Sequence, residues 1–370
     1  MKPARPITLL VLVLGAAAPW LISAYELSLL GRFLAFSLVA LGIMMTWGEG
    51  GILSLGQGVF FGLGGYALAM HLKLEGLDIA NGDMPDFMTW SGVSALPSLW
   101  RFFVNPWLSL VYVVLVPGVF AAFFGWLVFR RRIGGVYFAL ITQALALAFA
   151  TLLVSQQALT GGFNGLTNFS TFAGYDITSQ GAARVIYLIT FMLVAAAYFA
   201  LRWLLATRFG TMLRATRDGE NRIRFLGHNP LPYKVVAFTI AGSLSGIGGA
   251  LFTLHAGVIS PALVGVVPSI EMVVWVAVGG RGVLWGAIAG TLLVNFAKDE
   301  ISSALPSLWL YALGALFVLV VSFLPGGIAG MFSNPRLPPA YCAAARRLWN
   351  EPAARTGKRH RRFRWVQGAY

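Results

Sequence analysis

Polar side chains that could contact a solute are few in this sequence, and they stand inside long apolar stretches. They are Gln57, Thr142, Gln143, Glu271 and Asn295. A polar side chain inside a membrane-spanning segment is costly and usually faces a cavity or a partner. Amide, hydroxyl and carboxylate groups in such places exchange hydrogen bonds with polar solutes, so we predict that these five residues line a substrate pathway. The alternative for each of them is a hydrogen bond between two helices.

Glu271 is the acidic member of this set and lies in the stretch SIEMVVWVAVGGRG. Because a buried carboxylate loses its hydration, it needs either a partner or a water-filled vestibule. Of the five residues, Glu271 is therefore the one whose surroundings say most about whether it lines a pathway or pairs with another helix.

A charged segment could bind another protein. It has the sequence TRFGTMLRATRDGENRIRFLGHNPLPYK at residues 207–234, within a predicted cytoplasmic loop at 206–234. An apolar stripe at helical spacing runs along it, made of Met212, Thr216, Gly219, Ile223 and Leu226. Gly227 and Pro230 should end this helix. The residues that we expect to act in docking are Arg214, Arg217, Asp218, Glu220, Ile223, Leu226 and Gly227. The alternative is a solvated loop.

The composition indicates a membrane protein. Of the 370 residues, 58% are hydrophobic and 11% are charged, whereas a soluble chain carries about 25% charged residues. So few charges exclude a soluble enzyme and, despite the net charge of +14, a nucleic-acid-binding domain. One cysteine and four scattered histidines predict neither a disulfide framework nor a metal site. We expect an all-α polytopic membrane protein that binds no cofactor of its own.

Ten apolar stretches approach the length of about 20 residues that a membrane span needs. They lie near residues 7–25, 29–47, 51–72, 107–129, 134–154, 184–205, 235–256, 268–280, 282–297 and 307–324, the eighth and ninth being short and broken. The first stretch also has the features of a signal peptide. We favour a retained first helix, and its removal would leave the orientation of the others unchanged.

The distribution of charge predicts which ends are cytoplasmic. With the N-terminus inside, few of the 27 lysines and arginines fall on the outer side, namely Arg32, Lys73, Arg101, Arg184 and Lys298. This asymmetry is the one that the positive-inside rule requires. Both termini are then cytoplasmic, with a transmembrane domain at 1–332 and a basic, disordered tail at 333–370 that could lie on anionic lipid.

Eight glycines crowd residues 48–66, GEGGILSLGQGVFFGLGGY. A continuous lipid-facing helix does not need them, but a broken or re-entrant helix that lines a pathway does, because its freed backbone groups must meet protein or water. Tight helix packing is the alternative explanation. The chain carries no glycine-rich phosphate loop of the ATPase type, so ATP-driven transport would need a separate ATPase.

Several of these runs resemble one family. GGILSLGQGVFFGLGGYALAM, RRIGGVYFALITQALALAFATLL, GGFNGLTNF, GVISP and the charged segment resemble the permease subunits of branched-chain amino acid and urea ABC importers, the LivM type, over residues 28–332. MPDFM, the GGRG at Gly279–Gly282 and the VNFAK at Val294–Lys298 are most similar to the urea branch, the UrtC type.

The resemblance implies a transport subunit that is not itself an enzyme, in the bacterial plasma (inner) membrane. Its expected partners are a second permease, two cytoplasmic ATPases that use ATP, and an extracytoplasmic substrate-binding protein. Residues 208–230 would dock into the ATPase, although only Glu220 and Gly227 match the general docking pattern of such permeases. Urea is the expected solute. Import of branched-chain amino acids or short amides, and a stand-alone channel or secondary transporter, are the alternatives.

Overall fold

The structure, a computed structural model, describes residues 6–79, 82–93 and 95–304, and beyond them 311, 314–316, 318–319 and 326–332. The chain up to Met331 forms one compact unit. The tail predicted at 333–370 and most of the tenth apolar stretch, near 307–324, lie outside the described residues.

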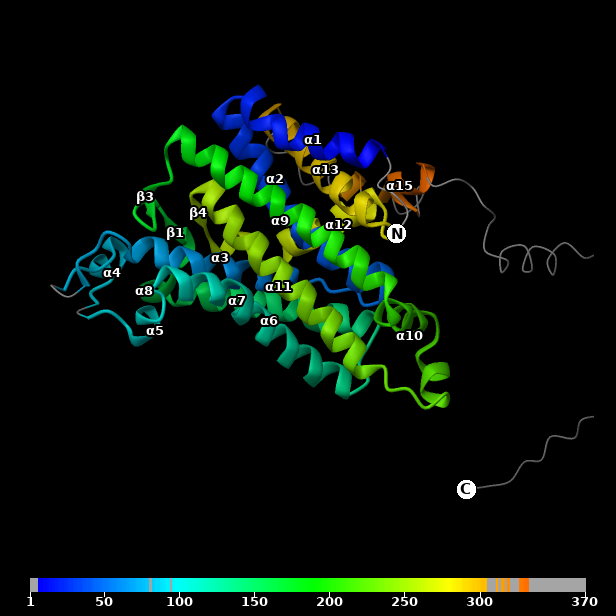
Figure 1. Cartoon of the computed structure of the whole chain (residues 1–370). Helices are drawn as coiled ribbons and strands as arrows, with labels where there is room; N and C mark the ends of the chain where they lie inside the picture. Colours follow the sequence, from blue (N-terminus) through cyan, green and yellow to red (C-terminus); the bar gives the residue numbers. More distant parts are fainter. Residues whose placement is uncertain are drawn as a thin grey trace, which may run out of the picture. The chain divides into compact units, whose positions relative to one another are not determined.

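The other nine predicted stretches are helices, which confirms the all-α fold class (Figure 1). These helices are α1 (Pro6–Leu21), α2 (Ala24–Ile43), α3 (Gln57–Leu74), α6 (Pro106–Arg130), α7 (Val136–Ser155), α9 (Gln180–Ala206), α11 (Leu231–Ala256), α12 (Val266–Gly279) and α13 (Leu284–Ala304). A π-helix, η1 (Met44–Glu49), continues α2, and the short α15 spans Gly327–Phe332. The charged segment forms α10 (Arg208–Phe225).

Local residues fix where several helices begin and end. The Ser23 hydroxyl accepts the backbone N–H of Glu26, and the Glu26 carboxylate accepts the N–H of Ser23 at 3.0 Å, which is a capping box at the start of α2. The side chain of Asn105 caps α6, whose first residue is Pro106. Gly257 ends α11 in the left-handed conformation, with φ of 66°.

Five helices in the described part of the chain are long and apolar enough to cross a membrane alone. They are Ala24–Glu49 (α2 with η1), α6, α7, α9 and α11, and the pair α12–α13, bent by 119°, is a sixth candidate span. α3 falls short of this standard of apolarity because 16 of its 18 residues are buried inside the protein, where they need not be lipid-soluble. The number of crossings and the side of each terminus stay predictions.

The central helix α3 is enclosed by α11, α6, α7, α12 and α2. In the main apolar windows, 72% of the residues are buried in α2 with η1 and 61% in α11, against about a third in α6, α7 and α9. α2, α3 and α11 therefore make the core, whereas α6, α7 and α9 present the apolar surface that lipid or another subunit covers.

Glycines allow α3 and α11 to cross at close range. A β-carbon on Gly64 would lie 2.1 Å from the carbonyl oxygen of Gly246, and one on Gly249 would lie 1.9 Å from that of Phe61. Each distance is too short for any side chain, so this crossing requires glycine. Tight packing thus accounts for part of the glycine-rich stretch at 48–66, and a break in the helix accounts for the rest, as described below.

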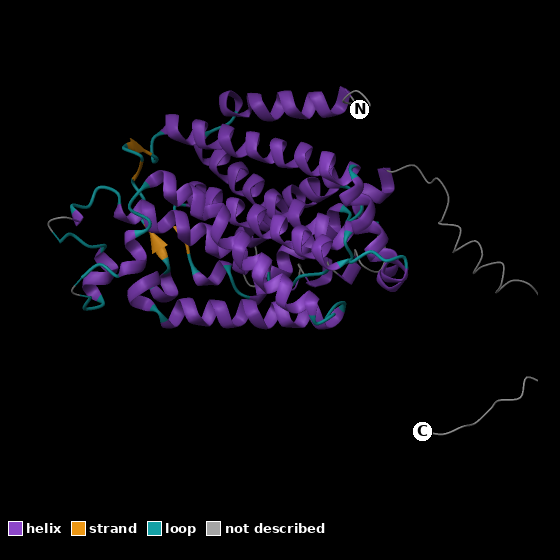
Figure 2. Cartoon of the chain, turned by 60° about the horizontal axis from the view of Figure 1, so that its bottom comes forward, coloured by secondary structure: helices purple, strands orange, loops and turns teal. Residues whose placement is uncertain are grey.

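The described parts of the loops at one end of the bundle contain short helices and strands (Figure 2). The loop at 73–106 carries α4 (Asp86–Trp90) and α5 (Ser98–Arg101). The loop at 155–183 carries α8 (Gln157–Thr160), the helical turn η3 (Gly162–Asn164) and three two-residue strands, β1 (Leu166–Thr167), β2 (Thr171–Phe172) and β3 (Tyr175–Asp176). β2 pairs with β3 in a hairpin, and β1 pairs antiparallel with β4 (Val258–Ile259), so the two runs GGFNGLTNF and GVISP meet.

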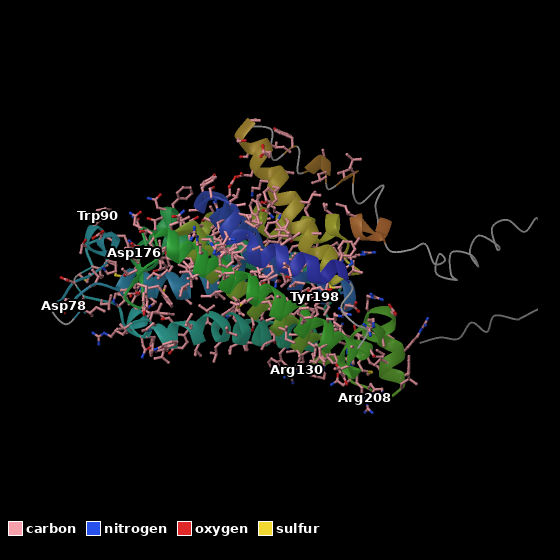
Figure 3. The ribbon with its side chains drawn as sticks, turned by 45° about the horizontal axis from the view of Figure 1, so that its top comes forward. Asp78, Trp90, Arg130, Asp176, Tyr198 and Arg208 are labelled. Carbon is pink, nitrogen blue, oxygen red and sulfur yellow. The ribbon has the colours of Figure 1, made fainter. Side chains whose placement is uncertain are left out.

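The two ends of the bundle differ in charge, as the sequence predicted. Asp78 and Asp176 lie at the end that carries these loops, and Arg130 and Arg208 lie at the opposite end, near α10 (Figure 3). We call the latter the α10 end. It is the end that the positive-inside rule places in the cytoplasm.

Candidate functional site

The helix that the glycine-rich stretch was predicted to break is broken between η1 and α3. Residues 51–56 are not helical, and α3 begins only at Gln57. The side-chain amide of Gln57 donates a hydrogen bond to the hydroxyl of Ser245 at 2.9 Å. Because Ser245 lies close to the middle of the 26-residue helix α11, α3 begins near half the depth of the bundle.

Neighbouring helices satisfy the backbone groups that the break frees. The Thr142 hydroxyl on α7 accepts the N–H of Leu55 at 3.0 Å, and the Ser269 hydroxyl on α12 accepts the N–H of Gly58 at 3.1 Å. A β-carbon on Gly56 would lie 2.2 Å from the carbonyl oxygen of Thr142, so α7 contacts the break directly. A buried backbone donor without a partner would be costly, and these two hydroxyls remove that cost.

A second non-helical segment, between α11 and α12, reaches the start of α3 from the end of the bundle that carries the loops. After α11 the chain returns through β4 and the helical turn η4 (Pro261–Leu263), and α12 then begins at Val266. The carbonyl oxygen of Val264 lies 2.6 Å from the position of a β-carbon on Gly58. The N-terminal ends of α3 and α12 therefore meet inside the bundle. We call residues 51–58, 139–142 and 264–269 the junction; its sequence contains no charged residue.

Two of the five predicted pathway residues, Gln57 and Thr142, belong to the junction. Gln57 is fully buried, and its side-chain oxygen has no hydrogen-bond partner. A buried polar atom that lacks a partner is a place where a solute donor could bind. Gln143 follows Thr142 on α7, is half-buried, and points about 100° away from it around the helix. The assignment of these residues to a pathway stays a prediction.

Glu271 and Asn295 lie together on the neighbouring pair α12 and α13. The ammonium group of Lys298 donates a hydrogen bond to the carboxylate of Glu271 at 2.6 Å, so this buried acid has the partner that it needs. The Asn295 amide donates to the carbonyl of Thr291 on its own helix at 2.8 Å. The buried indole N–H of Trp275, one turn after Glu271, has no partner.

The ion pair between Glu271 and Lys298 should hold α12 against α13. We expect Glu271→Gln to lower the stability of the protein by about 1–3 kcal/mol, because removing one partner of a buried pair leaves the other charge uncompensated, and Lys298 keeps some contact with solvent. Adding Lys298→Met to Glu271→Gln should recover most of the loss. Thermal unfolding in detergent measures both; a double variant less stable than Glu271→Gln alone would contradict this role.

The predicted apolar stripe of α10 exists, but most of it faces the bundle. Ile223 is buried, with 6% of its surface exposed, and Thr216 is also buried. Leu213, before the kink in this helix, belongs to a buried cluster with Leu41 of α2 and Leu205 of α9. Ile223 therefore presents little surface in this structure, and its expected action in docking stays a prediction. The exposed apolar pair at the tip is Phe225 (92%) and Leu226 (77%).

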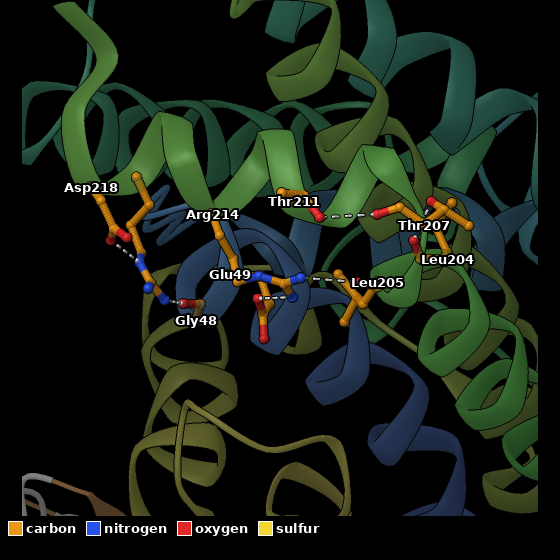
Figure 4. Close-up of polar contacts among 9 residues, drawn as sticks. Gly48, Glu49, Leu204, Leu205, Thr207, Thr211, Arg214 and Asp218 are labelled. Atoms are coloured by element: carbon orange, nitrogen blue, oxygen red, sulfur yellow. Dashed lines mark hydrogen bonds and ion pairs between the residues drawn. The ribbon is translucent and has the colours of Figure 1, made fainter. Parts of the chain in front are cut away.

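The arginines among the docking candidates already form ion pairs and hydrogen bonds with other groups of the same chain (Figure 4). Arg214 pairs with Glu49 at 3.0 Å and also donates to the carbonyl of Leu205. Arg217 donates to the carbonyl of Gly48 at 2.5 Å and pairs with the exposed Asp218 at 2.9 Å. These arginines thus face the permease itself, which the sequence could not indicate.

Glu220 joins the far end of α10 to the start of α11. Its carboxylate pairs with Lys234 and, at 2.8 Å, with Arg224. Burial alone would raise the pKa of the Glu220 carboxyl, but the hydrogen bonds and charges of Lys234 and Arg224 outweigh burial and lower that pKa below its ordinary value. The stabilisation from this cluster is therefore present at neutral pH and is lost as the pH falls through the lowered pKa. Gly227, with φ of 83°, follows the end of α10 as predicted.

Several residues of these sites were not predicted from the sequence, among them Ser245, Ser269, Glu49 and Lys298. Ser245 lies in a second glycine-rich run, LSGIGG, and small hydroxyl residues among helix glycines could have indicated it. The other three act through partners on distant elements, and nothing in their local sequence indicates the contact.

A bundle of apolar helices in which two helices begin at mid-depth, at a buried junction of polar and glycine residues, defines a multi-pass membrane protein of the transporter class. The sequence model of the family "branched-chain amino acid transport system / permease component" matches residues 25–321. The chain belongs to this family, and we describe it as LivM-like.

Known relatives agree with this assignment. The chain is 25% identical to the high-affinity branched-chain amino acid transport system permease protein LivM of Salmonella typhimurium, over 88% of this chain and 75% of the relative. It is 24% identical to the permease protein LivH of the same kind of system in Escherichia coli, over 80% of this chain and 91% of the relative. It is 28% identical to the autoinducer 2 import system permease protein LsrC of Salmonella choleraesuis, over 57% and 60%. No solved structure matches the chain significantly.

Proposed function

We propose that the chain is a permease subunit of an ABC importer in the bacterial plasma membrane, and that a small solute without net charge passes through the junction. The observation that supports this most directly is the junction itself, where hydroxyl, amide and backbone groups but no charged side chains meet at mid-depth. Its partners would be a second permease, two ATPases that use ATP, and an extracytoplasmic binding protein. The relatives LivM and LivH, each named as the permease protein of a transport system, support such an assembly.

Two solute classes fit the proposal. Branched-chain amino acids are favoured by the functions for which the LivM and LivH relatives are named, and the two helix N-terminal ends at the junction suit a carboxylate group. Urea is favoured by the MPDFM, GGRG and VNFAK runs, and the unpartnered oxygen of Gln57 could accept one of its N–H groups. Within VNFAK, Lys298 pairs with Glu271, so this run contributes an ion pair between α12 and α13.

Transport by the complete complex should require ATP. Proteoliposomes that contain this chain, its partner permease, the ATPases and the binding protein should accumulate labelled leucine or labelled urea only with ATP, and the preferred solute identifies the class. Vesicles that lack the ATPases are the control. Accumulation against a gradient by the permeases alone would contradict the proposal and favour a secondary transporter.

A further inference from the structure

α10 consists of two parts that bind different elements of the bundle. The backbone leaves the helical conformation at Gly219, where ψ is 79°, and this kink separates residues 208–218 from residues 220–225. We call them the first arm and the second arm. Each arm forms its own ion pair with another element of the same chain. Arg214 of the first arm pairs with Glu49, and Glu220 of the second arm pairs with Lys234.

The first arm binds the π-helix that leads into the break. Arg214 holds the carboxylate of Glu49 at 3.0 Å, and the side chain of Glu49 is only 14% exposed. Arg217 donates to the carbonyl of Gly48 at 2.5 Å, while Leu213 packs beside Gly50. Figure 4 shows Arg214 between Glu49 and Leu205 beneath the helix. Three side chains of the first arm, those of Leu213, Arg214 and Arg217, thus contact residues 48–50.

The same residues contact the turn between α12 and α13. A β-carbon on Gly48 would lie 1.8 Å from the carbonyl oxygen of Arg281, and the guanidinium of Arg281 lies over the ring of Trp47, 5.6 Å from its centroid. Gly48 is therefore held between Arg217 on one side and the α12–α13 turn on the other. A shift of the first arm that carries Gly48 with it would displace this contact.

The residues that the first arm contacts, 48–50, directly precede the junction, which begins at residue 51. Only residues 50–56 separate Glu49 from Gln57, and a stretch of that length spans at most about 25 Å. The break is also held at its far end, by Thr142 and by the contact of Gly56 with α7. A displacement of Glu49 would therefore be passed to the junction through a short segment that is held at both ends.

We infer that Arg214, Arg217 and Glu49 are positioning residues that transmit the movement of α10 to the mid-depth junction, instead of binding the ATPase. The second arm would instead receive the ATPase, because Phe225 and Leu226 are exposed at its end and Glu220 ties it to Lys234 at the start of α11. This inference rests on the proposed function, because the movement of α10 would come from the ATPases.

Neutral variants of the ion pair test the inference. We expect Glu49→Gln and Arg214→Gln each to leave the co-purification of the ATPases unchanged and to lower the number of solute molecules transported per ATP by about fivefold or more, the lower end of the usual range for coupling between sites. The double variant should be no worse than either single one, because both remove the same contact. Arg202→Gln, at an exposed arginine of α9 outside the segment 206–234, is the matched control and should behave as the wild type.

Three other results would overturn the inference. If Arg214→Gln released the ATPases while Glu49→Gln did not, Arg214 would be a docking residue. If both variants lowered only the amount of folded complex, and transport per ATP were unchanged, the pair would serve stability alone. If either variant transported normally, the pair would play no part. A wild-type complex that shows no ATP-dependent uptake would instead refute the proposed function, so the two failures can be told apart.

Discussion

Replacing Phe225 and Leu226 together with aspartate should release the ATPase subunits from the permease and abolish uptake. These side chains are 92% and 77% exposed on an otherwise charged helix at the α10 end. An exposed pair of large apolar residues marks a site of protein interaction. An apolar anchor in an interface contributes about 2 kcal/mol, so losing both should weaken binding by roughly three orders of magnitude. Co-purification of the ATPases with the tagged permease measures the loss.

A conservative pair of substitutions is the control. Phe225→Leu with Leu226→Met keeps the apolar surface and should keep the ATPases bound. Ile223 is unsuitable for this test because it is buried against the bundle, and a charge there would detach α10 from its own protein. Equal recovery of the ATPases from the aspartate and the conservative variants would show that the tip of α10 is not the docking point.

Most of the fold could be predicted because membrane helices are recognisable from their composition. Runs such as residues 107–129 are apolar over the required length, and the observed α6 covers Pro106–Arg130. The glycine content left a break near residue 50 as one of two explanations, and the end of α10 followed from Gly227. These are local properties, in which the sequence and the structure are directly related.

The sites could be predicted only in part, because their contacts join distant residues. The 3.6-residue spacing showed that α10 has an apolar face, but not that this face meets Leu41 and Leu205. The partner of Arg214 lies 165 residues away, and that of Glu271 lies 27 residues away on another helix. Charge type alone does not distinguish an arginine that binds another protein from one that binds its own chain.

The close crossing of α3 and α11 should tolerate no added side chain. Gly249→Ala would put a methyl group 1.9 Å from the carbonyl oxygen of Phe61. The two helices would therefore have to separate. Overpacking of this kind costs about 1–3 kcal/mol or more. Gly249 lies one turn from Ser245, and separation of the helices would also break the hydrogen bond that holds Gln57 at the start of α3. We therefore expect a lower unfolding temperature and a near-complete loss of uptake.

Gly181→Ala is the matched control for this prediction, because it makes the same chemical change in the apolar helix α9, at a position with no atom within 4 Å of the new methyl group. Alanine is favoured over glycine in a helix by up to about 1 kcal/mol, so Gly181→Ala should be as stable as the wild type or slightly more so. The two variants thus differ in the sign of the expected change, which a general effect of alanine on helices cannot produce. Thermal unfolding of both proteins in the same detergent gives the comparison. Equal unfolding temperatures would mean that α3 and α11 do not approach each other as closely as their glycines allow, and the position of the junction at mid-depth, which depends on that approach, would have to be abandoned.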